Sequence, residues 1–175
     1  APATTAHFRS LRSTSKQERD RAFAHALLTW ELTSVVERHV QLPAIDLPID
    51  LGVRPDDPIA TVERAASQAG SSLGLGSGPV PHVVRRLESR GVVFTRLPAM
   101  TRRVFAFSCE FPGRPVVVLS AERNHRAAGR FDAAHELGHL VLHHDEEPGT
   151  HAVERQANVF ASELLAPSSE IADLL

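Results

Sequence analysis

The sequence predicts an α+β fold, and the order of its hydrophobic patterns is the main reason. Three segments with apolar residues three or four positions apart occupy the first 90 residues, and three short segments rich in valine and phenylalanine follow up to residue 120. Two more segments with helical spacing run to about residue 165. Helices and strands in separate blocks favour a small, mostly antiparallel three-stranded sheet packed with helices. At 175 residues, 42% of them hydrophobic, the chain is long enough for one core.

The first expected element is a long N-terminal helix. Residues 1–14 are polar and are expected to fray. Ser15 and Glu18 then fit a capping box, and the helix should run from there to about Val40. Its apolar residues form a broad face that we expect to pack on the core: Phe23, Leu27, Leu28, Trp30, Leu32, Val35 and Val36. The alternative is a homodimer through this helix, which a monomer in size-exclusion chromatography would exclude.

A proline-containing connector separates this helix from the rest of the chain. Pro43 and Pro48 favour an extended backbone because proline disfavours a helical conformation in the residue before it. We therefore divide the molecule into residues 1–50, with the tail, the long helix and the connector, and residues 51–175, the main domain.

Two shorter helices are expected next. Asp57-Pro58 is typical of a helix start, and this helix should reach about Ala69. The glycine-rich loop that follows, SSLGLGSG, lacks a Walker lysine and does not follow a strand, so it is interpreted as a plain loop and not as a phosphate site. A third helix should run over Val80–Arg90 and end at Gly91.

The strands and the last helices complete the pattern. Strands are expected from Val92, over Arg103–Ser108 and over Pro115–Ser120, with a hairpin turn at FPGRP that makes the last two antiparallel. Two helices, over about Arg130–His143 and Val153–Leu165, follow them. Ser168 or Ser169 is expected to cap one more helix near the end of the chain.

Composition excludes several classes of function. The net charge is −2, which argues against direct binding of nucleic acid by this chain. No apolar run approaches the roughly 20 residues of a membrane span, and no signal peptide is visible. Cys109 is the only cysteine, so no intrachain disulfide forms, and we expect it to be a small buried hydrophobe. These features predict a cytoplasmic protein that does not bind membranes.

The stretch HELGH carries the strongest chemical signal. His135 and His139 are four residues apart, so on a helix both imidazoles leave the same side and can bind one metal ion. Glu136 lies between them and is placed to act as a general base on water. Gly138 inside the helix is expected to let another backbone, a strand edge or a substrate, come close. The motif predicts metal-assisted hydrolysis, most often of a peptide bond.

A third metal ligand is expected on the next helix. Glu154 shares a face with Ala157, Ala161 and Leu164, and a carboxylate on an apolar face needs a partner or a cation. Asn158, four residues on, can orient a histidine from behind. The weaker alternatives are His143, which would need a bent helix, and the loop residues Asp145, Glu146, Glu147 and His151. Zinc is the default metal for such ligands, although manganese or iron also accept them.

The two motifs together resemble the ImmA/IrrE family of bacterial and phage metallopeptidases. RFDAAHELGHLVLHH and ERQANVFASELLAP match the paired active-site helices of that family, and the resemblance extends over about Ile59–Pro167. It implies a zincin-like active-site helix, zinc ligands at His135, His139 and Glu154, and a general base at Glu136. Residues 51–175 would then form a zinc metallopeptidase-like domain.

The resemblance also implies a substrate, a helix-turn-helix repressor whose cleavage switches on stress, phage or mobile-element genes. Many members follow a helix-turn-helix domain, and no such pattern precedes residue 15 here. The alternative is a metal-binding sensor or regulatory domain of a transcriptional regulator with little or no proteolytic turnover. Because the chain has no tyrosine, the residue that stabilises the oxyanion stays open among five candidates: His125, Arg126, His143, His144 and His151. For His143 a role in substrate contact or oxyanion stabilisation is preferred over metal binding.

Overall fold

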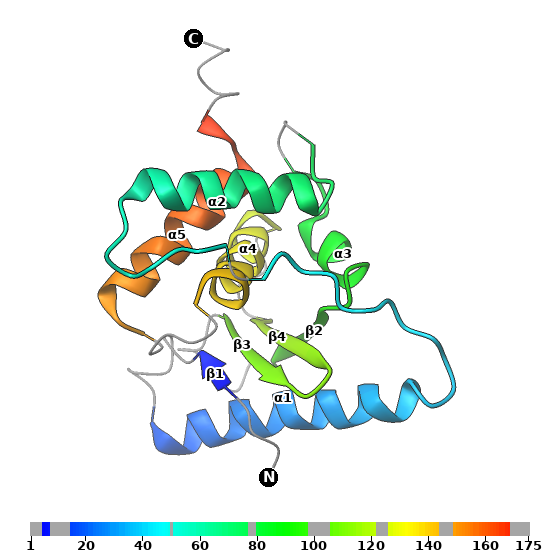
Figure 1. The fold of residues 1–175 in the computed structure, drawn as a ribbon. Helices are drawn as coiled ribbons and strands as arrows, with labels where there is room; N and C mark the ends of the chain where they lie inside the picture. The colour runs from blue at the N-terminus through cyan, green and yellow to red at the C-terminus, as the bar shows by residue number, and fades with distance from the viewer. Residues whose placement is uncertain are drawn as a thin grey trace.

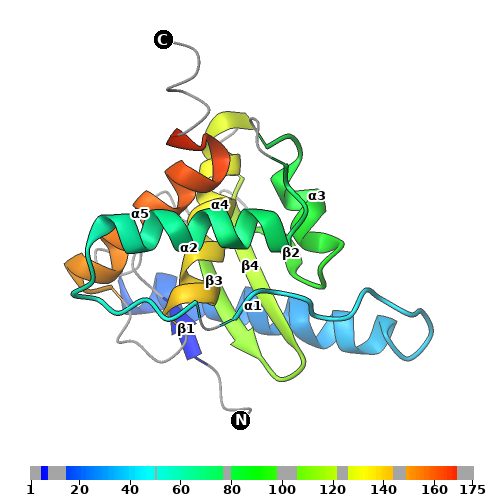
Figure 2. The same ribbon diagram turned by 45° about the horizontal axis from the view of Figure 1, so that its top comes forward.

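The computed structural model confirms the α+β class, with one sheet between two helical layers. It describes residues 5–7, 15–49, 51–76, 80–97, 106–121, 126–143 and 149–168. The elements are β1 (Thr5–His7), α1 (Lys16–Val36), α2 (Ile59–Ser72), α3 (Val83–Glu88), β2 (Val93–Leu97), β3 (Ala106–Phe111), β4 (Arg114–Ser120), α4 (Arg126–Leu142) and α5 (His151–Leu165). Helix α1 crosses one face of the sheet, while α4, α2 and α5 lie beyond the other face (Figures 1 and 2).

The sheet is larger and more mixed than expected. Its strand order is β1-β3-β4-β2, so it has four strands instead of three. Strand β1 comes from residues 5–7, which we expected to fray, and it pairs antiparallel with the outer edge of β3. An edge strand exposes unpaired backbone groups, which even a three-residue segment without a strand pattern can satisfy. The β3–β4 pair is antiparallel as predicted, whereas β2 and β4 are parallel.

The predicted hairpin turn between β3 and β4 is confirmed. Phe111 and Arg114 are register partners, so Pro112 and Gly113 alone make the turn. Gly113 has a φ of 83°, a conformation that residues with a side chain rarely adopt. The hairpin fixes which side chains of β3 and β4 face each helical layer.

The two faces of the hairpin serve two hydrophobic clusters. Toward α1 it presents alternate residues of both strands, packed with Ala22 and Ala26: Phe107, Cys109, Phe111, Val116 and Val118. Toward α4 it presents Ala106, Val117 and Leu119, which belong to the main core with residues of α2, α4 and α5. The period of two therefore places Ser108, between Phe107 and Cys109, on the α4 side.

Helix α1 begins as predicted but buries only half of its apolar face. The capping box of Ser15 and Glu18 is present, and the helix ends at Val36 instead of Val40. Phe23, Leu27 and Trp30 pack against the sheet. The other apolar residues are exposed: Leu28 57%, Leu32 68%, Val35 49% and Val36 45%. A dimer through this exposed stripe stays a prediction.

A buried arginine fastens the connector to the sheet. Arg114, only 8% exposed, donates from Nη1 to the backbone carbonyls of Pro43 and Gly91, at 2.7 and 3.0 Å. Its guanidinium also pairs with Glu37 at the end of α1. One side chain at the start of β4 thus holds the end of α1, the connector and the turn before β2 in place.

Helix boundaries differ from the sequence predictions by a few residues. Helix α2 has Pro58 as its N-cap and continues to Ser72, and α3 is much shorter than the predicted Val80–Arg90. The helix predicted after Ser168 falls mostly outside the described residues. No helix in the described ranges is both long and apolar enough to cross a membrane.

Candidate metal centre

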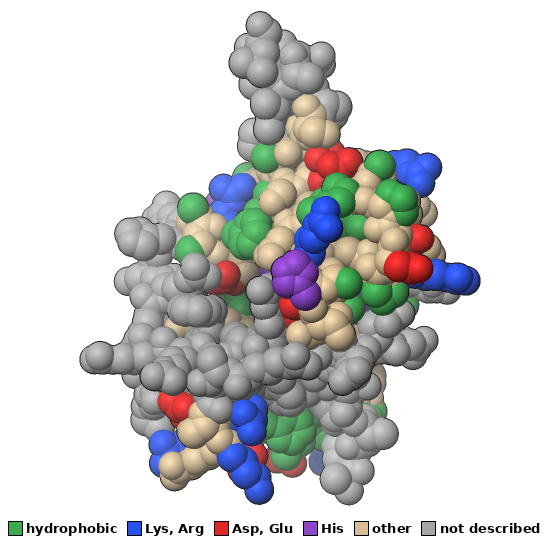
Figure 3. Space-filling view, turned by 90° about the vertical axis from the view of Figure 1, so that its left-hand side faces the viewer, with side chains coloured by type: hydrophobic (Ala, Val, Ile, Leu, Met, Phe, Trp, Pro, Cys, Tyr) green, Lys and Arg blue, Asp and Glu red, His purple; other side chains and the backbone are tan. Residues whose placement is uncertain are grey.

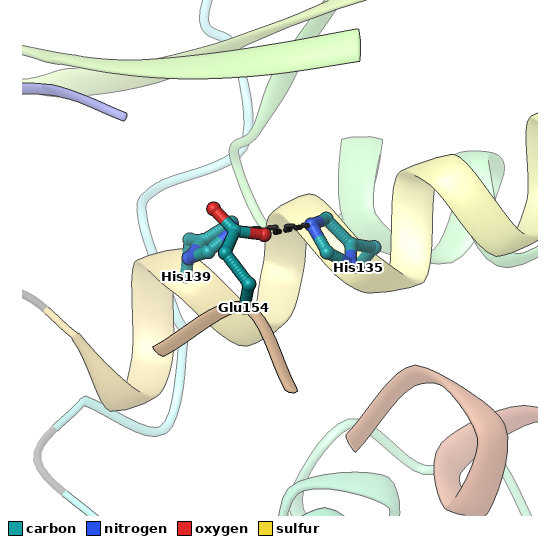
Figure 4. A group of neighbouring side chains, drawn as sticks. All are labelled: His135, His139 and Glu154. Atoms are coloured by element: carbon teal, nitrogen blue, oxygen red, sulfur yellow. Dashed lines mark hydrogen bonds and ion pairs between the residues drawn. The ribbon is translucent and has the colours of Figure 1, made fainter. Parts of the chain in front are cut away.

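Helices α4 and α5 bring the three predicted ligands together. His135 and His139 leave α4 one turn apart, with their Nε2 atoms 3.1 Å from each other. Glu154 reaches across from α5, and its Oε2 lies 3.4 Å from His135 Nε2 and 3.6 Å from His139 Nε2. Figure 4 shows the three side chains converging between the helices. Among the described residues, this is the group of histidine and carboxylate side chains able to hold a metal ion.

The spacing of these atoms fits a tetrahedral metal ion. For zinc, metal–ligand distances of about 2.0–2.2 Å place neighbouring ligand atoms roughly 3.3 Å apart. The measured triangle has edges of 3.1, 3.4 and 3.6 Å. Two nitrogens and one carboxylate oxygen are also the donor set of many hydrolytic zinc sites, which keep a fourth position for water. The residues present therefore fit a catalytic metal.

Helix α5 presents Glu154 to α4 because its inner face is apolar and its start is capped. The Thr150 side chain accepts a hydrogen bond from the backbone N–H of Val153. Glu154 is 3% exposed and shares the buried face with Ala157, Ala161 and Leu164, as the spacing predicted. A carboxylate in such surroundings is costly unless a charge or hydrogen bonds compensate it.

Gly138 lets α5 approach α4 at the site. A Cβ atom built on Gly138 would lie 3.3 Å from the Cα of Ala157 and 3.2 Å from Cδ1 of Phe160. The backbone that the glycine admits is thus that of α5. The close approach sets how far the Glu154 carboxylate reaches.

Gly138→Ala is expected to weaken metal binding about 10-fold, because moving α5 outward draws Glu154 away from the histidines. Gly129→Ala is the matched control, since it lies on the same helix and its Cβ would meet nothing within 4 Å. The control should gain up to roughly 1 kcal/mol of stability from helix propensity. Zinc titrations and urea unfolding of both variants check this; equal zinc affinity would refute the role of Gly138.

Asn158 fixes the protonation of one ligand. Its Oδ1 lies 3.0 Å from His135 Nδ1. A carbonyl oxygen only accepts, so Nδ1 carries the hydrogen and Nε2 carries the lone pair that faces the cluster. Asn158 therefore occupies the orienting position expected from the sequence.

Glu136 is buried beside the cluster and is held by a strand residue. The Ser108 hydroxyl donates to Glu136 Oε2 at 2.8 Å, and both side chains are nearly inaccessible. Burial raises the pKa of Glu136, although His139, His135 and the Ser108 hydrogen bond act in the opposite direction. A carboxylate with a raised pKa is a better proton acceptor near neutral pH. Sequence analysis missed Ser108; its one signal was a polar residue amid the apolar FAFSCEF.

Cys109 is buried on the opposite face of β3, as expected. Burial, with a smaller effect of the Glu136 charge, raises the pKa of its thiol to about 12. At pH 8 the native thiol should therefore react with Ellman's reagent about 10³-fold more slowly than the unfolded chain, whose cysteine has an ordinary pKa. Because it is the only cysteine, one progress curve with and one without denaturant suffices. Rapid reaction of the native protein would contradict the buried placement.

His143 does not occupy the substrate-facing place that we preferred for it. Its side chain is fully buried, with Nδ1 3.3 Å from His139 Nδ1 and Nε2 3.0 Å from Gln156 Oε1. Burial lowers its pKa to about 4, more than the Gln156 hydrogen bond raises it, so His143 is neutral at physiological pH. It contacts His139 but is not itself one of the three residues of the metal cluster, and it does not meet solvent.

Of the other candidates for oxyanion stabilisation, only His151 has a side chain that the structure describes. His151 is exposed at the first residue of α5. His125, His144 and the side chain of Arg126 lie outside the described residues, as do Asp145, Glu146 and Glu147. The assignment therefore stays open.

Figure 3 shows one side of the molecule, where described basic, acidic and hydrophobic side chains are interspersed with histidine at the surface, so neither sign of charge dominates there.

Comparison with known proteins agrees with the resemblance of the motifs. No curated protein matches the chain. A peptidase M78 family model, described as the IrrE N-terminal-like domain, matches residues 88–175, half of the chain. The match spans the sheet strands β2, β3 and β4 and both helices of the candidate centre. The chain therefore belongs to the family of IrrE N-terminal-like domains, a family of metallopeptidases.

Proposed function

We propose that the chain is a zinc-dependent endopeptidase that hydrolyses a peptide bond in a helix-turn-helix repressor. The observation that carries the chemical part is the triangle of His135, His139 and Glu154 with the buried Glu136 carboxylate beside it. A site that only stabilised the fold would not need a buried carboxylate next to an open ligand position. The choice of a repressor as substrate is supported by the family alone.

His135, His139 and Glu154 would hold the zinc ion, which supplies Lewis-acid activation of water and of the scissile carbonyl. Glu136 then takes one proton from the attacking water as its oxygen bonds to the carbonyl carbon. When the C–N bond breaks, Glu136 returns that proton to the leaving amine nitrogen. Ser108 engages Oε2, so we assign both proton transfers to Oε1.

Strand β1 lies where a substrate strand would add to the sheet. It pairs with the outer edge of β3, with His7 opposite Ser108, the residue that holds Glu136. A substrate that bound by strand addition at this edge would have to displace β1.

Deleting residues 1–14 is therefore expected to raise kcat/KM roughly 5-fold, the factor that about 1 kcal/mol of lost strand pairing represents. Assays of the full and shortened chains on one substrate check this. As a control, replacing residues 1–4 alone should change little, because they precede β1. An unchanged or lower rate after deletion would rule out strand addition to β3.

The proposed function is tested by metal analysis followed by cleavage. Purified protein is assayed for zinc, manganese and iron, then incubated with helix-turn-helix repressors from the same organism, and products are identified by mass spectrometry. One zinc per chain and a single internal cut support the proposal. Zinc binding without cleavage of the repressor or of unstructured peptides would favour the regulatory alternative, and failure to bind any metal would overturn both the metal site and the enzyme.

A further inference from the structure

A line of buried polar groups runs from the segment before α2 to the metal cluster. Gln156 Nε2 donates to the backbone carbonyl of Arg54 at 2.6 Å. Gln156 Oε1 then faces His143 Nε2 at 3.0 Å, and His143 Nδ1 faces His139 Nδ1 at 3.3 Å. Gln156 and His143 are 5% and 0% exposed, so solvent does not replace these partners.

The direction of each hydrogen bond in this line is determined by its first member. A backbone carbonyl only accepts, so the group of Gln156 that faces Arg54 must be the amide NH2. Its oxygen therefore faces His143, which must donate from Nε2. A neutral imidazole with hydrogen on Nε2 has its lone pair on Nδ1, where it can accept only.

His139 is consequently left with one tautomer. Its Nδ1 must donate to His143 Nδ1, so its Nε2 carries the lone pair and faces His135 and Glu154. If His143 instead donated to His139 Nδ1, the hydrogen of neutral His139 would lie on Nε2 and block a metal ion. The line thus has one arrangement that permits metal binding.

We propose that Gln156 and His143 are positioning residues. The hydrogen bonds that begin at the Arg54 carbonyl and pass through them keep the hydrogen of His139 on Nδ1, so that the Nε2 lone pair of His139 is directed at the metal position. The proposal rests on the metal site of the proposed function but not on peptidase activity. Asn158 fixes the tautomer of His135 through one direct hydrogen bond, whereas Gln156 fixes the tautomer of His139 indirectly, through His143. Both orienting amides come from α5, the helix that also supplies Glu154.

The test reads the tautomer directly in metal-free protein. Protein labelled with ¹⁵N-histidine is measured by multiple-bond ¹H–¹⁵N correlation, with His139 and His143 assigned through His143→Phe. The wild type should show hydrogen on Nδ1 of His139 and on Nε2 of His143. Gln156→Met keeps the side-chain length but can neither donate to Arg54 nor accept as an amide does, so His139 should become a mixture of tautomers.

Zinc affinity, measured by competition with a chromophoric chelator, should fall about 10- to 100-fold in Gln156→Met. Gln68→Met, on the exposed side of α2, is the matched control and should bind as the wild type does. Gln156→Leu, which likewise can neither donate to Arg54 nor accept from His143, serves if the methionine variant does not fold. Hydrogen on Nε2 of His139 in the wild type would overturn the proposal, and so would unchanged zinc affinity in a folded Gln156→Met or Gln156→Leu. Absence of zinc binding in the wild type together with the expected tautomers would instead count against the proposed function.

Discussion

Glu136→Gln is expected to lower kcat/KM for peptide cleavage by about 10²–10⁴-fold, the usual contribution of a positioned general base. The amide has nearly the shape of the carboxylate but cannot take a proton from water. It can still accept the hydrogen bond of the Ser108 hydroxyl, which now joins the carboxylate at 2.8 Å. The loss should therefore appear in kcat, with the packing between β3 and α4 kept. Initial rates on a quenched fluorescent peptide from the cleaved repressor measure it.

Two controls separate a lost base from a damaged site. Zinc content should stay at the wild-type level, because Glu136 is not among the three residues whose atoms form the cluster. Glu163→Gln makes the same chemical change on the neighbouring helix, where the side chain contacts Ser168 and not the cluster, and should leave the rate unchanged. A Glu136→Gln variant that binds zinc and cleaves at the wild-type rate would show that another group is the base.

The cluster itself could be predicted from the sequence because its geometry is local. Two histidines four positions apart face the same way on any helix, and α4 delivers them 3.1 Å apart. Glu154 was predictable for a related reason, since its neighbours at helical spacing are apolar and become buried. Periodicity therefore identified both faces before their contact was known.

Contacts between distant segments were not predictable in the same way. Ser108 meets Glu136 from a strand 28 residues earlier, and only the sheet register decides which face of β3 a residue occupies. Gln156 is one of several polar residues on α5, and its role depends on the carbonyl of Arg54, 102 residues away. Every residue has a backbone carbonyl, so the sequence does not indicate which one Gln156 contacts, and the structure was needed to identify it.

The sheet and α1 show where pattern alone is insufficient. Strand β1 has three residues and no alternation, and β2 lies parallel to β4, its neighbour in the sheet but not in the sequence. On α1, Trp30 and Leu32 looked equivalent by spacing. The structure packs Trp30 on Phe111, with ring centroids 5.3 Å apart, and leaves Leu32 68% exposed. Hydrophobic spacing identifies a helix, but it does not indicate which of the apolar residues on its face become buried.

Glu154→Gln is expected to remove most of the stabilisation that zinc gives to the folded protein. A ligand present at about 1,000 times its Kd stabilises the folded state by about 4 kcal/mol, and a 100-fold loss of affinity at that concentration removes about 2.7 kcal/mol of it. Replacing the anionic ligand with a neutral amide should weaken zinc binding by at least about 100-fold, since the carboxylate supplies the only negative charge of the proposed ligand set. Urea unfolding with and without zinc measures the difference for each protein.

Glu163→Gln, on the same helix but hydrogen-bonded to Ser168, should keep the full zinc response. An equal zinc response in Glu154→Gln would show that the third ligand lies elsewhere.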